Sequence, residues 1–245
     1  MPSQTLPRTP SESISWLHEQ TLVMVGKLTL REKVIPSCYS LMRGTLCGHA
    51  ITLHTHRFTG SVVRCLTLAS VRKQKTSEMC GLALIGLPTA SSLLPIVTME
   101  LRLASDALSW VSIDLFPTDP SLFASHATPI LASLRDRVSP HGTAHPRPTQ
   151  RVDTLSPLAL LCQASVGQEA ALTQAIGVFL QQVTTLFDRS HSEDTSSERT
   201  QRAWQAQRDW LRGEQINRRE SRAMSTVFGE PAAERYLQDF LFNVP

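Results

Sequence analysis

Short apolar segments follow one another between residues 46 and 116, and they have the texture of β-strands. They are rich in β-branched residues and are separated by Gly, Lys-Gln-Lys, Ser-Ser and Ser-Asp. The segments are HAITLHTHRF, SVVRCLTLASV, MCGLALIGL, LPIVTMELRL and LSWVSIDLF. Four or five strands joined by such short turns predict an antiparallel meander. Because the apolar runs are almost continuous, we expect both faces of the sheet to be covered, here by helices.

Helical patterns precede and follow the strand region. The first predicted helix is capped by Ser11 or Ser13, and Pro120 favours the start of the second. Pro129 would kink or shorten that second helix. The predicted helices cover residues 14–35 (helix and turn), 119–137, 166–188, 199–225 and 231–242.

This order of elements predicts the fold class. Strands come first and most helices later, with no internal repeat and no linker that divides the chain. The pattern favours an α+β fold: a three-layer α/β/α sandwich with a central, mainly antiparallel β-sheet flanked by helices. We expect residues 1–13 to form a flexible N-terminal segment and residues 14–245 to form a single domain.

Composition excludes several classes of function. The 245 residues are 41% hydrophobic and 18% charged, with a net charge of +3, which is ordinary for a globular protein and too weakly basic to indicate nucleic-acid binding. No apolar run has the length of a membrane span, and the polar N-terminus has no signal-peptide core. The five cysteines include no CxxC pair, which indicates reduced thiols. We therefore expect a cytoplasmic protein with no membrane or nucleic-acid partner.

Familiar catalytic motifs are missing, since the sequence has no GxGxxG, Walker loop, GxSxG or HExxH. His54 and His56 share one face of a predicted strand, but no third ligand is near, so we expect no metal site. Seven arginines against three acidic residues lie between residues 199 and 222, with Trp204 and Trp210 among them. Two interpretations stay open: a solvated helix face with two Trp anchors, or a surface for an anionic ligand or an acidic protein.

Two acidic residues, Glu100 and Asp114, interrupt the apolar strands. A carboxylate among apolar neighbours is costly unless it is paired or protonated, and desolvation favours the protonated form that a general acid needs. The alternative is a side chain that faces solvent or meets an arginine, such as Arg102 on the same strand face as Glu100. For Glu100 both interpretations stay open, and for Asp114 the second is favoured.

Two blocks of sequence carry a family resemblance. In residues 64–118, Leu94-Pro95 precedes an acid at Glu100, and Ile113-Asp114-Leu115 follows on the next strand. In residues 153–244, DTLSPLALLC precedes a long helix, and QRDW, NRRESR and FGEPAAERYLQDFLFN follow in order. These resemble the LP-x-x-x-x-D, IDL and FSP segments and the two closing helices of the ferredoxin-dependent bilin reductases, enzymes that reduce open-chain tetrapyrroles.

The resemblance implies a fold, a substrate and a source of electrons. It implies an antiparallel sheet between helix layers, with a biliverdin-type bilin between the sheet and the C-terminal helices. It also implies no bound cofactor, neither metal nor flavin. Electrons would come singly from reduced ferredoxin, an acidic partner, and protons would come from side chains around the pigment. We expect the protein to be a monomer.

Carried over by position, the resemblance assigns site residues. Glu100 replaces the family's strand Asp with an arm one methylene longer, and is the expected catalytic proton donor. Ser156 and Arg219 are expected to hold bilin propionates, the latter as a bidentate pair. Asn217 matches the family, whereas Arg218 stands where the family has its second acid and cannot replace it as a proton donor. The expected substrate-binding residues are thus Ser156, Asn217, Arg218 and Arg219.

Other family positions depart from the pattern. One branch, which converts biliverdin to phycocyanobilin, has a His and a Glu on the two preceding strands, where this chain has Cys80–Ala83 and LTLASV. Three functions therefore stay open. They are a divergent bilin reductase that converts biliverdin or a dihydrobiliverdin to a phytobilin, a tetrapyrrole-binding relative without the reduction, and an unrelated α+β interaction protein.

Overall fold

The computed structural model describes residues 9–104, 107–145, 154–190, 194–216 and 218–243, of which residues 218–220 are described by their backbone alone. In these ranges one sheet of nine strands has the order β1-β3-β4-β5-β6-β7-β9-β8, with β2 also paired to β3. The strands are β1 (Arg31–Glu32), β2 (Leu41–Leu46), β3 (His49–Thr59), β4 (Val63–Lys73), β5 (Met79–Pro88), β6 (Ile96–Ala104), β7 (Ala107–Phe116), β8 (Gly142–Ala144) and β9 (Leu160–Ala164). Every pairing is antiparallel. Strands β3 to β7 form the predicted meander.

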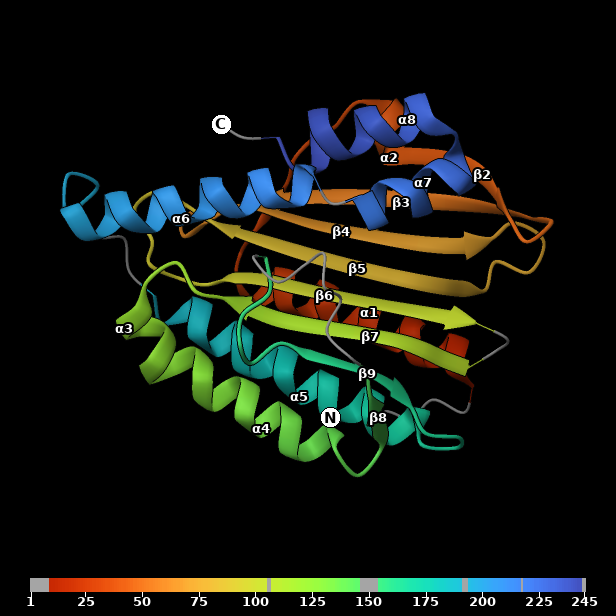
Figure 1. Cartoon of the computed structure of the whole chain (residues 1–245), viewed down its shortest axis with the longest axis horizontal. Helices are drawn as coiled ribbons and strands as arrows, with labels where there is room; N and C mark the ends of the chain where they lie inside the picture. Colours follow the sequence, from red (N-terminus) through yellow and green to blue (C-terminus); the bar gives the residue numbers. More distant parts are fainter. Residues whose placement is uncertain (1–8, 105–106, 146–153, 191–193, 217, 244–245) are drawn as a thin grey trace.

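Helices cover both faces of this sheet (Figure 1), as the sequence predicts. The helices are α1 (Pro10–Lys27), α2 (Ser37–Ser40), α3 (Pro120–Leu122), α4 (Thr128–Val138), α5 (Glu169–Asp188), α6 (Glu198–Gln215), α7 (Arg218–Phe228) and α8 (Glu230–Glu234). Two π-helical segments, η1 (Phe123–Ala127) and η3 (Arg235–Leu241), precede α4 and follow α8. One layer contains α1, α4 and α5, and the other contains α6, α7, α8 and η3. The three-layer α+β sandwich is confirmed.

The two layers bury separate apolar clusters. Alternate residues of the strands, such as Leu84 and Met99, are fully buried against α1, α4 and α5 around Phe179. On the opposite face, Ile96 belongs to a smaller cluster with Trp210 of α6. Since side chains alternate along a strand, each strand contributes to both clusters.

The C-terminal layer is joined to β3 by contacts between side chains far apart in the sequence. Thr55 and Tyr236 share a hydrogen bond of 2.9 Å between their hydroxyl oxygens. Arg57 Nη2 donates to the carbonyl oxygen of Phe240 at 2.7 Å, and its Cζ lies 3.9 Å from the Phe240 ring centroid. The rings of Tyr236 and Phe240, four residues apart, are tilted against each other with centroids 5.5 Å apart.

Helix α1 begins earlier than the sequence pattern predicted. Its N-cap is Thr9, whose hydroxyl accepts from the Glu12 backbone N–H at 3.2 Å, while the Glu12 carboxylate accepts from the Thr9 N–H at 2.9 Å. This capping box, with Pro10 in the first turn, outweighs the predicted caps at Ser11 and Ser13. Residues 10–13, predicted as part of a flexible segment, are therefore helical.

Other predicted helices are divided. The helix expected over 199–225 is broken, because α6 ends at Gln215 and α7 begins at Arg218. The helix expected over 119–137 contains η1, since Pro129 lacks the N–H that a continuous ladder needs and instead occupies the first turn of α4. Strands β2 and β8 were not predicted; β8 has three residues and no apolar alternation.

Helix α5 is apolar enough and long enough to cross a membrane by length and composition alone, although no such run was recognised in the sequence. In the structure, 56% of its most apolar window is buried. Its buried residues include Leu172, Ile176 and Phe179, which belong to the larger core cluster. Core helices of globular proteins pass the same test, and α5 packs as one of them.

Candidate functional site

The sheet face toward α6, α7 and η3 is only partly covered. On β6, Thr98, Glu100 and Arg102 share the face of Ile96, whereas Val97, Met99 and Leu101 point to the other side. In contrast with the fully buried opposite face, six side chains in the middle of this face keep partial exposure. We call them the open strip: Ala69, Val71, Ala83, Thr98, Glu100 and Arg102. The register aligns Ala69 with Ala83 and Ala83 with Glu100 across three strands.

Glu100 is the acid of this strip, and two side chains hold it. Trp110 Nε1 on β7 donates to Glu100 Oε2 at 3.0 Å. Arg102 Nη2 pairs with Glu100 Oε1, which is one of the two arrangements that the sequence left open for this acid. The Glu100 side chain is 20% exposed and that of Arg102 35%. The carboxylate is therefore positioned by two donors and still reachable from solvent.

A histidine that the sequence did not single out lies beside this group. The rings of Trp110 and His145 have centroids 5.2 Å apart. His145 Nε2 lies 3.2 Å from the Ser109 carbonyl oxygen, an atom that can only accept, so Nε2 carries the proton in this contact. His145 follows the three-residue strand β8 and lies in a Pro-rich stretch that is typical of an exposed loop. Its place in the sheet is known only from the structure, in which its backbone N–H donates to the Leu161 carbonyl oxygen. Trp110 thus links an imidazole and a carboxylate.

Asp114 is buried and so does not face solvent, one of the two arrangements favoured for it, while the other, contact with an arginine, stays a prediction. It is 1% exposed and lies two residues along β7 from Ser112, the register partner of Glu100. Asp114 Oδ2 accepts from the Ser156 backbone N–H at 2.6 Å, and Oδ1 accepts from the Ser156 hydroxyl. Hydrogen bonds of this kind offset the desolvation of a buried carboxylate. The predicted contact of Ser156 with a propionate stays a prediction, since here its hydroxyl bonds to Asp114.

The other predicted substrate-binding residues lie where α6 gives way to α7. Asn217 is outside the described residues, and Arg218 and Arg219 open α7 with side chains that are also outside them. Their roles stay predictions. The break that the structure shows does place two arginines in the first turn of a helix, where the helix dipole also favours anions.

At the positions where one family branch has a His and a Glu, this chain has neither residue. On β5, Gly81 and Ala83 lie on the face of the open strip, and Cys80 Sγ contacts the Val71 carbonyl oxygen at 3.5 Å. Burial raises the pKa of the Cys80 thiol, so it is no proton donor near neutrality. Small residues leave the floor of the strip flat.

His54 and His56 do share one face of β3, as predicted. His56 Nδ1 contacts Glu32 Oε1 at 2.7 Å, and burial, followed by the charges of Arg72 and His56, lowers the pKa of His54. In the described ranges, no group of three or more His, Cys, Asp or Glu side chains is placed to hold a metal ion.

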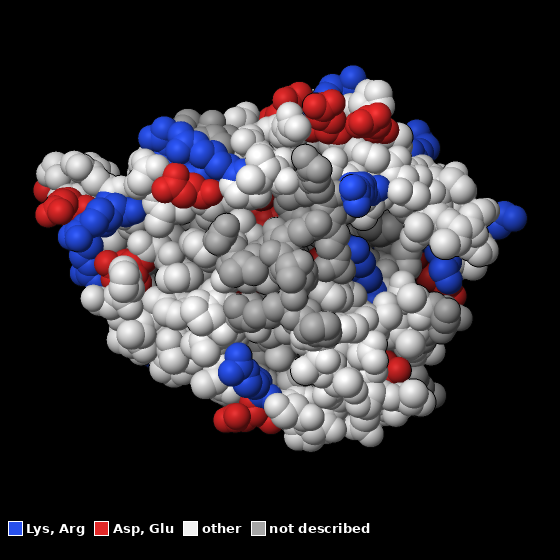
Figure 2. All heavy atoms as spheres, viewed as in Figure 1, with Lys and Arg blue, Asp and Glu red and all other residues white. Residues whose placement is uncertain are grey.

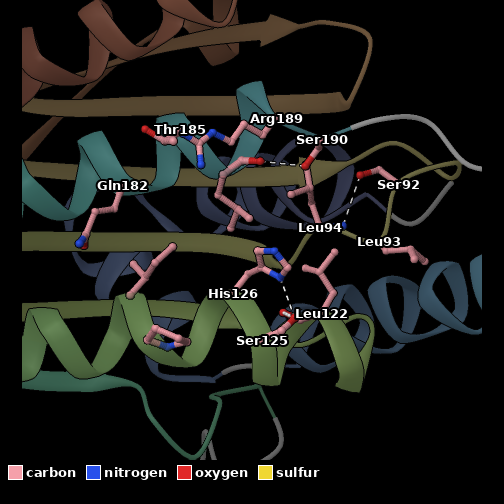
Figure 3. Close-up of a pocket in the computed structure, with 13 residues that line it drawn as sticks. Ser92, Leu93, Leu94, Leu122, Ser125, His126, Gln182, Thr185, Arg189 and Ser190 are labelled. Carbon is pink, nitrogen blue, oxygen red and sulfur yellow. Dashed lines mark hydrogen bonds between the residues drawn. The ribbon is translucent and has the colours of Figure 1, made fainter.

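A cavity of about 570 Å³ lies in the other helix layer, between η1, α4, the end of α5 and the β5–β6 connection. Its apolar walls include Leu93, Leu122 and Ile130, and His126 and Arg189 lie among its polar residues (Figure 3). No Asp or Glu is among the described residues that line it. Because Glu100, the carboxylate that the family resemblance assigns as proton donor, lies in the open strip and not in this cavity, we place the candidate site at the open strip.

The fold that carries this site is that of the bilin reductases. The structure is similar to phytochromobilin synthase from tomato, crystallised in complex with biliverdin, with a TM-score of 0.75 and 16% identity over 94% of this chain and 82% of that chain. It is also similar to PcyX, with a TM-score of 0.53 and 12% identity over 95% and 98% of the two chains. At these identities the likeness shows the fold alone.

The sequence itself gives the family. The family model for ferredoxin-dependent bilin reductase matches residues 18–243. The chain therefore belongs to the ferredoxin-dependent bilin reductase family. A search of the curated proteins found no match.

Proposed function

We propose that the protein reduces a biliverdin-type linear tetrapyrrole with electrons from reduced ferredoxin. Membership of the family supports this activity, and the observation that carries it is the partly exposed Glu100 in the open strip, at the position of the family's strand Asp. Reduction of one double bond takes two electrons and two protons. Ferredoxin supplies the electrons one at a time, so the protein must supply protons and hold an anionic intermediate.

The open strip suits a flat pigment. Ala69 and Ala83 lie in register with Glu100 on three neighbouring strands, and Gly81 adds no side chain at all. Such a floor allows a conjugated ring system to lie against the sheet, with Glu100 and Arg102 at one side. Apolar contact with the pigment and a few placed polar groups are the usual composition of a cofactor-sized site.

Glu100 and Arg102 have complementary roles in this proposal. Arg102 holds the carboxylate at rest, and the negative charge that arrives on the reduced bilin competes for the same guanidinium. When Arg102 turns to the bilin, Glu100 is released from the ion pair and can carry a proton to it. His145, reached through Trp110, is a second group of the right chemistry to replace a proton.

The propionates of the bilin would lie toward the start of α7. Arg218 and Arg219 occupy its first turn, where their charges add to the helix dipole, and Asn217 precedes them. Ser156 would join them only by sharing the hydroxyl that now bonds to Asp114. In this proposal the protein is a cytoplasmic monomer and needs no resident metal or flavin.

A specific observation keeps a non-catalytic binder as the second candidate. The family's second acid is replaced by Arg218, no acid occupies β4 or β5 on the open strip, and Glu100 is held by Arg102. Such a site could bind a bilin through its carboxylates without protonating it.

An anaerobic assay with biliverdin, ferredoxin and a ferredoxin-reducing system separates the two candidates. A bound absorbance spectrum that decays to a new pigment supports the reductase, and the product's spectrum identifies the reduced bond. A stable bound spectrum supports the binder. No spectral change on addition of biliverdin contradicts both.

A further inference from the structure

A cluster of unpaired polar groups lies between α6 and the first residues of β4. We call it the Arg64 corner, and it consists of Arg64, Trp204, Gln207 and Arg208. The Cζ of Arg64 is 5.1 Å from the Trp204 ring centroid. Gln207 and Arg208 follow Trp204 by three and four residues, so the three side chains are neighbours on one helix face. Figure 1 shows α6 on the same side of the sheet as α7 and α8.

Gln207 is completely buried, and neither its amide nitrogen nor its amide oxygen has a hydrogen-bond partner in the described structure. The same holds for the buried Nε and Nη2 atoms of Arg64 and for the buried Nε of Arg208. A buried donor or acceptor that lacks a partner keeps the cost of its lost hydration, so such groups are rare in folded proteins. The contact of Arg64 with Trp204 and the spacing of Gln207 and Arg208 from Trp204 along α6 bring the side chains that carry these five atoms toward one another.

The charge of the corner indicates what binds. Burial lowers the pKa of Arg64 below its ordinary value, and the positive charge of Arg57 lowers it further, although Cys65 opposes this. Arg57 itself already donates to the Phe240 carbonyl, and no described carboxylate pairs with Arg64 or Arg208. Two guanidinium groups with free donors and no counter-ion favour an anion.

We propose that the Arg64 corner binds a small oxyanion, a phosphate or a carboxylate group. The guanidinium groups of Arg64 and Arg208 and the amide nitrogen of Gln207 donate to it, and Trp204 forms an apolar wall. Charge-assisted bonds of this kind are about twice as strong as neutral ones. The Gln207 oxygen is of the right type to accept from either guanidinium. An oxyanion therefore provides partners for donors that are otherwise buried without any.

This site is separate from the open strip. Arg64 precedes Ala69 by five residues along β4, which corresponds to roughly 17 Å of strand. Cys65, Leu87 and Ile96 fill the space between as part of the cluster around Trp210. A bilin over Glu100 would therefore leave the corner free, and the proposal does not depend on the protein being a reductase.

Thermal unfolding of the bilin-free protein tests the proposal. Inorganic phosphate is titrated at constant ionic strength, with sodium chloride as the balance, so that general screening stays fixed. A ligand of the native state raises Tm with its concentration. We expect Tm to rise and saturate for the wild-type chain and to lose most of this rise in Arg64→Gln and Arg208→Gln. Acetate, titrated in the same way, distinguishes a carboxylate site from a phosphate site.

Matched variants sharpen the result. Arg202→Gln removes an exposed arginine of the same helix, paired to Glu198 at 3.8 Å, and should keep the full phosphate-dependent rise. Gln207→Leu removes the unpaired amide, so we expect an equal or higher Tm without phosphate and a smaller rise with it. No rise with either anion beyond the sodium chloride control overturns the proposal. A full rise in both Arg64→Gln and Arg208→Gln, or an equal loss in Arg202→Gln, overturns it as well.

Discussion

The two faces of the central sheet are built from the same strands, but their side chains are buried to different degrees. Toward α1, α4 and α5, Leu68, Leu84 and Met99 are 0–1% exposed. Toward the C-terminal helices, their strand neighbours Ala69 and Thr98 keep partial exposure. The first face provides the packing that holds the fold, and the second provides a small-residue floor with one reachable acid. Substitutions on the second face therefore need not disturb the core.

Glu100→Gln should have the largest effect, and it should fall on the chemistry alone. The amide keeps nearly the same shape but cannot carry the proton, so we expect reduction to slow by roughly 10²–10⁴-fold while the bilin still binds. Single-turnover absorbance with reduced ferredoxin measures the rate, and titration with biliverdin measures binding.

The neighbouring imidazole provides the comparison for this variant. We expect His145→Gln to slow reduction less than Glu100→Gln, because His145 reaches the strip through Trp110. Normal turnover in Glu100→Gln together with a large loss in His145→Gln would assign the proton donor to the histidine instead.

Two adjacent residues of β5, one on each face of the sheet, test how tightly the two faces are packed. Leu84→Ala removes a fully buried side chain and should lower the free energy of unfolding by about 2–5 kcal/mol. Ile85→Ala acts on the other face, where the side chain is only partly buried, and should lower it by about 1 kcal/mol. Urea denaturation of the two variants gives the comparison, and equal losses would show that both faces are packed alike.

An ion pair away from the two sheet faces should contribute less to the free energy of unfolding, and its contribution should depend on pH. Arg199 donates to both Asp119 carboxylate oxygens at 2.8 Å, and this bonding lowers the pKa of Asp119 from 3.8 to about 2. Because the folded-state pKa is depressed, the stabilisation is present above pH 4 and is lost as the pH falls toward 2. We expect Asp119→Asn to cost about 1–2 kcal/mol at pH 7.

The free energies of unfolding of this variant and of the wild type should begin to converge as the pH falls below 4 and should meet near pH 2. Arg212→Gln, which breaks an exposed pair with Asp209, is the control and should change stability by less than about 0.5 kcal/mol at either pH. A loss in Asp119→Asn that is independent of pH would contradict the ion-pair account.

The smallest expected effect concerns the encounter with ferredoxin. Ferredoxin is acidic and the chain carries a net charge of +3, but Figure 2 shows acidic side chains gathered near α8 as well as basic ones over α6. Raising the ionic strength from about 0.05 to about 0.5 M should slow ferredoxin-driven reduction by a few-fold and leave bilin affinity nearly unchanged. Equal losses of rate and affinity would count against charge-steered docking.

Much of the fold could be predicted, because hydrophobic patterns are local. The five strands from β3 to β7 and the long helix α5 follow from runs of apolar residues and their spacing. Strand β8 could not be predicted, since its three residues pair with β9, which is distant in the sequence. Strand β2 pairs with the adjacent β3 across the turn at Cys47-Gly48, so its signal was local and was not recognised. At Thr9 the signal was present in the sequence, and the capping box with Glu12 would have placed the start of α1 correctly.

Of the residues in the candidate site, the sequence singled out Glu100 but not the residues around it on other strands. Glu100 and its neighbour Arg102 lie on one strand, so period-two alternation already places them together. The links to Trp110 and His145 cross from β6 to β7 and then to β8, which no sequence spacing reveals. The contact of Asp114 with Ser156 could not be predicted, because the two residues are 42 positions apart in the sequence.

The contacts of the C-terminal layer determine when the site can form. Thr55 and Arg57 meet Tyr236 and Phe240 across 181 and 183 residues, whereas the strands of the meander pair with their immediate neighbours. During synthesis, β3 to β7 can therefore pair long before residues 228–243 leave the ribosome. At an elongation rate of about 5–20 residues per second, the nascent sheet therefore lacks its C-terminal layer for several seconds, and the open strip takes its final surroundings only at the end of synthesis.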